Sequence, residues 1–230
     1  MEKYTLKIEL LSDTIFSGGE SIISVSDIDV LYDDYKMPFY KGKSIKGNIR
    51  EVMDIILENQ KLYDEEKSKF NEEIAIKLFG KIFNNKGKES YRDDQSQGCL
   101  KFENASINKD TKEVLKYLVD LGSIKKDEII DALTDIRYST KIDKDSGTSA
   151  DGSLRSMRVL NKDICFYSEI YSEEELSENE LGLLLCGVNG LRHLGTLRSR
   201  GKGEVKCTLL INNKELSKEA LNKIVEKVIG

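Results

Sequence analysis

Apolar residues recur along this chain at two different periods, and the order of those periods limits what it can fold into. Residues 5–11 alternate between polar and apolar side chains, which predicts a strand with one buried face. Residues 45–56 carry apolar side chains at steps of three and four, which predicts a helix. The same two patterns return later as strands at 99–107, 136–142 and 163–171, a helix at 178–191, a strand at 204–211 and a terminal helix at 214–229. This succession predicts an α+β fold, a ferredoxin-like or RRM-like βαββαβ sheet with insertions.

The remaining segments are long enough to be excursions from one sheet. We expect a single domain over residues 1–230, because the chain shows no internal repeat and no low-complexity linker. Three insertions are predicted at about 20–41, 60–97 and 108–162. Their predicted helical parts are a charged, exposed helix at 61–75 and shorter helices at 111–121 and 126–133, while 74–80 forms a short apolar stretch.

Composition excludes several classes of protein. With 39% hydrophobic and 33% charged residues, the chain can build a core and is too apolar to be disordered. No segment approaches the roughly 18 consecutive apolar residues of a membrane span, and the start does not resemble a signal peptide. The four cysteines are scattered without a CxxC pair, which predicts reduced, mostly buried thiols in a cytoplasmic protein. The single histidine leaves little for histidine-based catalysis.

The charge is unevenly distributed along the chain. The net charge of −5 argues at face value against nucleic-acid binding. However, residues 41–50 contain four cations and no acid, and residues 191–206 contain five cations against one acid, Glu204. Because a phosphate chain responds to the local charge of the groove that holds it, these two segments are candidate nucleic-acid contacts.

The later basic segment is also rich in glycine. Its glycines are Gly195, Gly201 and Gly203, and its alternating cations are Arg198, Arg200 and Lys202. Glycines let a backbone approach a ligand closely, and the cations can meet successive phosphates. The segment follows a predicted helix and precedes a strand, the reverse of a dinucleotide-binding loop. A solvated connector remains the alternative.

The earlier basic segment opens the helix at 45–56. Gly42 lies at the mouth of the helix and Ser44 is the predicted N-cap, so free backbone N–H groups there would form an anion site. The nearby cations are Lys41, Lys43, Lys46 and Arg50. The P-loop spacing is absent because no upstream glycine is present, which argues against a nucleotide hydrolase. The alternative is an ordinary capped helix with a cationic face.

Taken in order along the chain, these segments resemble the RAMP superfamily of CRISPR proteins, in particular the backbone subunits of type III effectors. The resemblance is carried by Ser17-Gly18-Gly19, Lys41-Gly42-Lys43-Ser44-Ile45-Lys46-Gly47, Leu78-Phe79-Gly80 and the loop from Gly195 to Gly203. Lys41 stands where the family usually has proline, which adds a cation. The stretch from Thr140 through Arg155 to Phe166 resembles the family's thumb-like β-hairpin.

The resemblance implies a subunit that holds the phosphates of a guide (CRISPR) RNA in a basic groove while the bases pair with target RNA. The implied phosphate contacts are Lys41, Lys43, Ser44, Lys46, Arg50, Arg198, Arg200 and Lys202, with Arg155 and Arg158 reaching RNA from the thumb region. The implied partners are guide RNA, target RNA, other RAMP subunits and the large subunit of a type III complex. No membrane partner is expected.

Many type III backbone subunits also cut the target RNA with an aspartate in the excursion after the first glycine pair. Placing Val30-Leu31 on the family's apolar pair puts Asp27 at the catalytic position, with Asp29 as the second candidate. The implied activity is a metal-dependent endoribonuclease that uses a divalent cation such as Mg²⁺, with no firmly bound cofactor and with unknown metal ligands. The alternatives are a non-catalytic subunit that caps the guide 5′ end or serves as scaffold, a standalone guide-processing nuclease and a protein-interaction domain.

Overall fold

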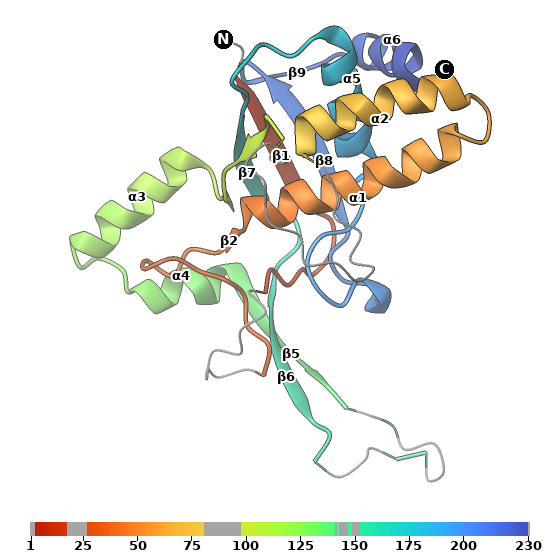
Figure 1. Ribbon diagram of the computed structural model, residues 1–230. Coiled ribbons are helices and arrows are strands. Elements are labelled where there is room, and N and C mark those ends of the chain that lie inside the picture. Colours follow the sequence, from red (N-terminus) through yellow and green to blue (C-terminus); the bar gives the residue numbers. More distant parts are fainter. Residues whose placement is uncertain are drawn as a thin grey trace, which may run out of the picture.

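The fold is built on one antiparallel sheet. The computed structural model describes residues 3–17, 27–80, 98–140, 142, 147–148 and 152–229. The central strand β1 (Tyr4–Leu10) pairs with β7 (Cys165–Tyr171) on one side and β8 (Val205–Ile211) on the other. The short strands β2 (Phe39–Tyr40), β4 (Ala105–Ser106) and β9 (Lys214–Glu215) complete the order β2-β4-β7-β1-β8-β9, and β3 (Lys101–Phe102) also pairs with β7. Figure 1 shows the sheet beside its helices.

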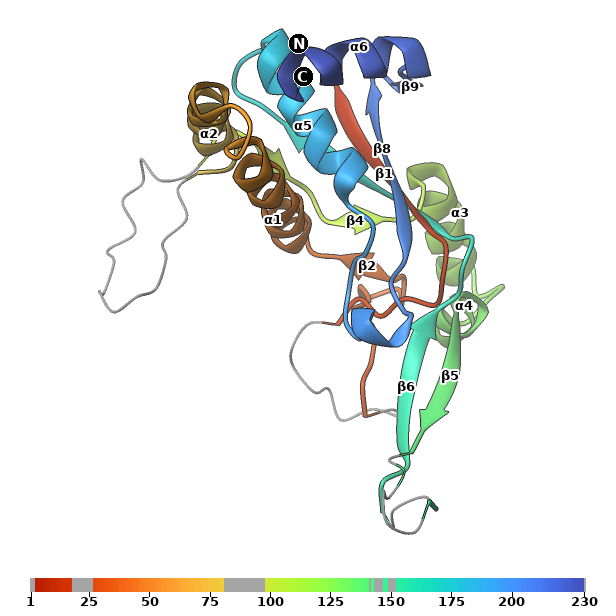
Figure 2. The same cartoon turned by 90° about the vertical axis from the view of Figure 1, so that its right-hand side faces the viewer.

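Helices cover one face of this sheet. The alternation in β1 buries Leu6, Ile8 and Leu10 completely on that face, as predicted, whereas Lys7 and Glu9 stay half-buried on the other. The covering helices are α1 (Gly42–Gln60), α2 (Glu65–Phe79), α5 (Glu178–Gly190) and α6 (Lys218–Ile229). In Figure 2, α1, α2 and α5 lie on one side of β1 and β8. The expected mixed fold is confirmed, and the predicted strands and helices occur in the expected order. The short strands β2 and β9 and a strand at 155–160 were not predicted.

The predicted stripe on α1 forms the contact with α5. Ile45, Ile49 and Met53 are buried there. Gly187 of α5 lies against them, because a Cβ at this position would approach Met53 Cγ to 2.7 Å and Ile49 Cγ2 to 2.8 Å. The two helices therefore approach closely, and this contact positions α1 against the rest of the fold.

The prediction that the charged helix would be exposed is wrong in part. Helix α2 begins at Glu65 and continues through the predicted apolar stretch to Phe79. Ser68 and Asn71 are buried, and Asn71 donates to Gln60 Oε1 and to the Val228 carbonyl. The buried side of α2 is thus partly polar, and its hydrogen bonds join α1, α2 and α6 in a way that hydrophobic periodicity does not reveal.

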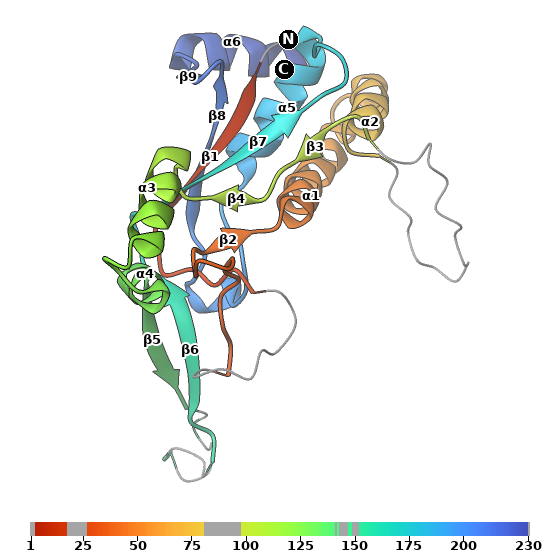
Figure 3. The same ribbon diagram turned by 90° about the vertical axis from the view of Figure 1, so that its left-hand side faces the viewer.

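A two-stranded hairpin extends from the sheet at the end opposite α6 (Figure 1). It consists of β5 (Thr134–Ser139) and β6 (Arg155–Leu160), paired in register from Thr134↔Leu160 to Ser139↔Arg155. It follows α3 (Lys109–Asp120) and α4 (Lys126–Leu133), which lie across the sheet from α1 and α2 (Figure 3). The hairpin occupies the region that resembles the family's thumb, and most of the loop from 141 to 151 lies outside the described residues.

Several smaller predictions can be compared with the structure. The strand expected at 99–107 is divided into β3 and β4, and the terminal helix begins only at Lys218, after β9. All four cysteines are free thiols, but only Cys186 and Cys207 are buried. Among the described residues, none of the helices has the length and apolar character needed to cross a bilayer.

Candidate RNA interface

Residues 12–16 lie where the predicted site segments meet. Thr14 exchanges backbone hydrogen bonds of 3.1 and 2.7 Å with Leu160 at the base of the hairpin. The Ile15 carbonyl accepts from Thr196 N of the glycine-rich loop at 3.1 Å, and the Phe16 carbonyl accepts from Leu31 N at 2.8 Å. These bonds hold three segments together at one end of the sheet: the glycine-rich loop, the base of the hairpin and the segment that begins at residue 27. Figure 2 also shows this arrangement.

Two of the three glycines in the glycine-rich loop are required because the loop packs closely against other parts of the chain. Gly195 has φ +82°, and a Cβ there would lie 2.3 Å from the Ile15 carbonyl oxygen. Gly203 has φ +80°, and its Cβ would lie 2.1 Å from the Leu194 carbonyl oxygen. Only Gly201, with φ +70°, has open space around this position. The expectation of backbone approach to a ligand therefore fits Gly201, whereas Gly195 and Gly203 close the loop onto its neighbours.

The loop presents its cations on a short 3₁₀ helix, Arg198–Arg200. Arg198 and Arg200 are both exposed; Arg198 lies 4.0 Å from the Glu51 carboxylate, and Arg200 has no ion pair with a described residue. Both guanidinium groups are thus accessible to an external anion.

The third cation of the glycine-rich loop, Lys202, forms an ion pair with Asp13. Lys202 Nζ lies 3.7 Å from Asp13 Oδ2, the same oxygen that accepts from Arg137 Nε of the hairpin at 3.0 Å. Asp13 therefore ties the glycine-rich loop to the hairpin. The sequence analysis missed Asp13 and Arg137, because their pairing joins residues 124 positions apart.

The N-terminus of α1 is capped differently from the prediction. The N-cap is Lys41, without a side-chain cap, and Ser44 lies inside the first turn. The Gly42 N–H is not free, because it donates to Asn104 Oδ1 at 3.0 Å. A Cβ at Gly42 would lie 2.1 Å from the Phe102 carbonyl oxygen, so this glycine is required by the close passage of the chain after β3. The prediction of a free N–H at Gly42 is wrong, since Asn104 accepts its hydrogen bond, and anion binding by the neighbouring residues stays a prediction.

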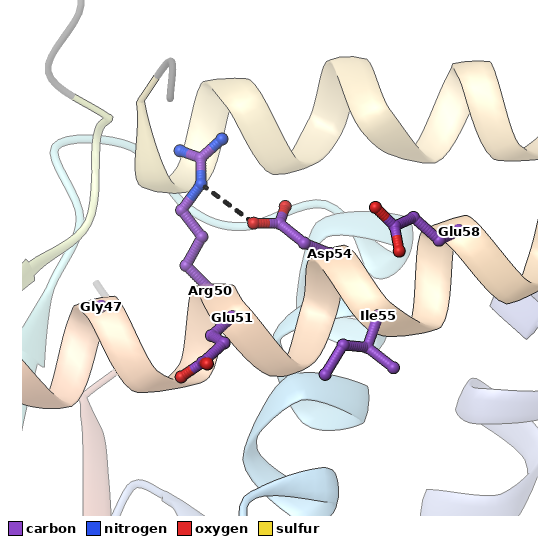
Figure 4. Close-up of a pocket in the computed structure, with 6 residues that line it drawn as sticks. All are labelled: Gly47, Arg50, Glu51, Asp54, Ile55 and Glu58. Atoms are coloured by element: carbon purple, nitrogen blue, oxygen red, sulfur yellow. Dashed lines mark ion pairs between the residues drawn. The ribbon is translucent and has the colours of Figure 1, made fainter. Parts of the chain in front are cut away.

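The cations of α1 divide into two groups. Lys41 and Lys43 are exposed. Lys46 Nζ donates to the Leu100 carbonyl at 2.7 Å, and burial lowers the pKa of this ammonium. Arg50 lies 3.9 Å from Asp54 in a shallow groove that is also lined by Glu51 and Glu58 (Figure 4). Exposed positive charge is therefore concentrated at the very start of α1, and the RNA contacts of Lys46 and Arg50 stay predictions.

The two candidate catalytic aspartates have different surroundings. Asp27 is exposed, and its Oδ2 accepts from Ser156 N at 2.8 Å. No described residue donates to the other oxygen of Asp27. The Asp29 side chain is only 9% exposed, and its Oδ1 accepts from Val30 N at 2.8 Å and lies 3.5 Å from Arg158 Nε. Asp27 therefore offers a carboxylate oxygen to solvent, whereas Asp29 is held within the protein.

The two arginines of β6 also differ. Arg155 is exposed and has no ion pair with a described residue. The Arg158 side chain is 14% exposed and contacts three acceptors at the hairpin base. Of the two, only Arg155 is exposed to solvent, and RNA contacts of both arginines stay predictions.

Comparison with known proteins identifies the family. A model described as the RAMP superfamily matches residues 7–206. The chain belongs to the RAMP superfamily. No curated protein sequence matches it.

Two solved structures share the fold of this RAMP chain. One is the type III-B Cmr-beta cryo-EM structure of the apo state, with a TM-score of 0.59 and 14% identity. The other is type III-B Cmr-beta bound to cognate target RNA, with a TM-score of 0.61 and 14% identity. Each match covers 91% of this chain and 97% of the other. The likeness therefore extends over almost the entire RAMP fold.

The motifs that carry the family resemblance are only partly described. Gly18 and Gly19 lie outside the described residues. Leu78 and Phe79 end α2 as buried residues, and Gly80 follows with φ +89°, a conformation that favours glycine. The Leu78-Phe79-Gly80 motif thus terminates a helix of this RAMP chain and does not belong to the exposed basic surface.

A divalent cation at Asp27 would need ligands from elsewhere. Among the described residues, no group of three or more histidine, cysteine or acidic side chains could hold a metal ion. Mg²⁺ is commonly bound by one or two carboxylates together with phosphates of the substrate. The open oxygen of Asp27 matches one such carboxylate, and its contact with a metal ion stays a prediction.

Proposed function

We propose that this RAMP chain is a cytoplasmic subunit of a type III effector complex, where it binds guide RNA along its backbone and cleaves the paired target RNA. The family membership and the fold shared with type III-B Cmr-beta structures, one of them bound to cognate target RNA, support the complex. In this proposal its partners are guide RNA, target RNA, other RAMP subunits and the large subunit.

The observation that carries the proposal is that exposed cations from distant parts of the sequence and an exposed carboxylate lie on segments held at the same end of the sheet. The cations come from segments far apart in the sequence: Lys41 and Lys43 from the start of α1, Arg155 from the hairpin, and Arg198 and Arg200 from the glycine-rich loop. The backbone bonds of residues 12–16 hold the hairpin, the glycine-rich loop and the segment that carries Asp27 at one end of the sheet. Leu31 of that segment in turn accepts from Phe39 N, two residues before Lys41. Local positive charge there can bind a phosphate chain despite the net charge of −5.

The proposed division of labour follows from these surroundings. The exposed cations contact phosphates, so they bind RNA without regard to sequence, and base pairing between guide and target supplies specificity. Asp27 acts at the target backbone, where its open oxygen orients the 2′-hydroxyl or binds a divalent cation. A bound divalent cation would stabilise negative charge at the scissile phosphate.

Replacement of Asp27 tests the catalytic part. In a complex assembled with guide RNA, Asp27→Ala is expected to keep guide and target binding and to lose metal-dependent cleavage, measured as a single-turnover rate on labelled target. Asp34→Ala is the matched control, because Asp34 is an exposed acid of the same segment. Unchanged cleavage by Asp27→Ala would contradict the assignment of Asp27. A wild-type complex that binds both RNAs without cutting would indicate the non-catalytic scaffold or end-capping subunit.

A further inference from the structure

We propose that Arg158 is a positioning residue, which with Asp29 locks the segment carrying Asp27 onto the hairpin base. This inference rests on the proposed cleavage of target RNA and assigns Arg158 a role other than phosphate binding. It also separates the two candidate aspartates: Asp27 acts on RNA, and Asp29 holds Asp27 in place.

The side chain of Arg158 joins three parts of the chain. Its Nη1 donates to Asp131 Oδ1 of α4 at 3.0 Å and to Thr134 Oγ1 of β5 at 2.9 Å. Its Nε lies 3.5 Å from Asp29 Oδ1. With 14% of the side chain exposed and these acceptors around it, the guanidinium has little surface left for an RNA phosphate.

The backbone of the same strand holds the segment beside Asp27. Asp27 N donates to the Ser156 carbonyl at 3.1 Å, and Arg158 N donates to the Ile28 carbonyl at 2.9 Å. Ile28 thereby forms a parallel bridge with Met157. Because alternate residues of a strand share a face, Ser156 and Arg158 present their side chains to the same side. On that side, Ser156 Oγ donates to Asp27 Oδ2 at 3.4 Å, and Arg158 Nε lies 3.5 Å from Asp29 Oδ1.

Loss of the guanidinium would disturb this arrangement through Asp29. Asp29 is 9% exposed, and a carboxylate with so little access to water is costly when its cation is removed. Asp29 would then move toward solvent, and Asp27 is only two residues away. A displacement of about 1 Å at a catalytic group can reduce a rate by about 100-fold. The cost of breaking the Arg158–Asp29 pair would therefore appear in the rate of cleavage.

Arg158→Gln in the assembled complex tests the proposal. The single-turnover cleavage rate is expected to fall by about 10- to 100-fold, with the affinity for guide RNA and its salt dependence unchanged. The double variant Asp29→Asn/Arg158→Gln should be no slower than Arg158→Gln alone, because both replacements break one interaction. Arg158→Lys, which keeps the charge, should cleave at an intermediate rate and serves if Arg158→Gln does not fold. Lys162→Gln, at an exposed cation just after β6, is the matched control and should change neither rate nor affinity.

Hydrogen exchange provides a readout that does not depend on cleavage. The amides of Asp27 and Arg158 should exchange faster in Arg158→Gln than in the wild type, and Lys162→Gln should leave them protected. If the wild-type complex does not cut at all, the proposed cleavage fails while the exchange still tests the lock. Unchanged amide protection and cleavage, together with a salt dependence weaker by about one phosphate contact, would overturn the proposal and make Arg158 an RNA contact.

Discussion

The glycine-rich loop gives a quantitative prediction about RNA binding. Arg198 and Arg200 lie on a 3₁₀ helix with exposed side chains. Within the described part of the chain, their one ion pair joins Arg198 to Glu51 at 4.0 Å, and these side chains are 48% and 65% exposed. A pair of this kind contributes no more than about 1 kcal/mol, so Arg198→Ala/Arg200→Ala should fold as the wild type does.

The expected effect on binding follows from counterion release. Each neutralised phosphate contributes about 0.7 to the slope of log affinity against log salt for single strands, and about 0.9 for a duplex. Loss of two contacts should flatten the slope by about 1.4 to 1.8. Between 50 and 200 mM salt, the wild type should therefore lose about 7- to 12-fold more affinity than the double variant.

Fluorescence anisotropy with labelled guide RNA at several salt concentrations measures both slopes. Lys61→Ala/Lys223→Ala is the matched control, because it removes two exposed cations far from the loop and should leave the slope unchanged. A loss of affinity restricted to some RNA sequences would refute backbone contact by this loop. A slope equal to that of the wild type would refute contact altogether.

Two further predictions concern stability. Gly203→Ala should destabilise the protein by about 3 kcal/mol in urea unfolding, since its Cβ would meet the Leu194 carbonyl at φ +80°. Gly201→Ala, which has open space at φ +70°, should cost about 1 kcal/mol. Equal losses of stability would contradict the packing argument. Burial tends to raise the pKa of Glu180, but hydrogen bonds from Lys77 and Ser177 outweigh it, and the pKa lies below its usual 4.5. The unfolded carboxyl therefore takes up a proton first, so the stabilisation is present above pH 4.5 and is lost as the pH falls through the folded pKa. Glu180→Gln should reduce the loss of stability between pH 6 and 3, and an unchanged pH dependence would contradict this account.

The elements that hydrophobic periodicity controls were predictable from the sequence. The alternation of Leu6, Ile8 and Leu10 and the stripe of Ile45, Ile49 and Met53 are buried as expected, because each pattern has an apolar face that the sheet or helix layer removes from water. The charged helix α2 was recognised as a helix but not as partly buried. Its buried Asn71 is satisfied by hydrogen bonds that sequence periodicity does not encode.

The candidate site was predictable as a set of segments, but not as a set of contacts. The basic, glycine-rich sequence of the late segment predicted accessible cations, and Arg200 is exposed there. The cap on Gly42 comes from Asn104, and the acceptors of Arg158 come from three other segments. Such long-range hydrogen bonds depend on how elements pack, so local sequence patterns could not separate an accessible cation from one held inside the protein.

The most direct test of the account is a structure of the assembled complex with guide and target RNA. We predict phosphates in salt-bridge contact with Arg198 and Arg200, and an Asp27 oxygen within about 4 Å of a target phosphate oxygen, the span of two Mg²⁺–oxygen bonds. Arg158 should still contact Asp29 in that structure. RNA bound elsewhere on the chain, with Asp27 far from the target backbone, would contradict the central claim.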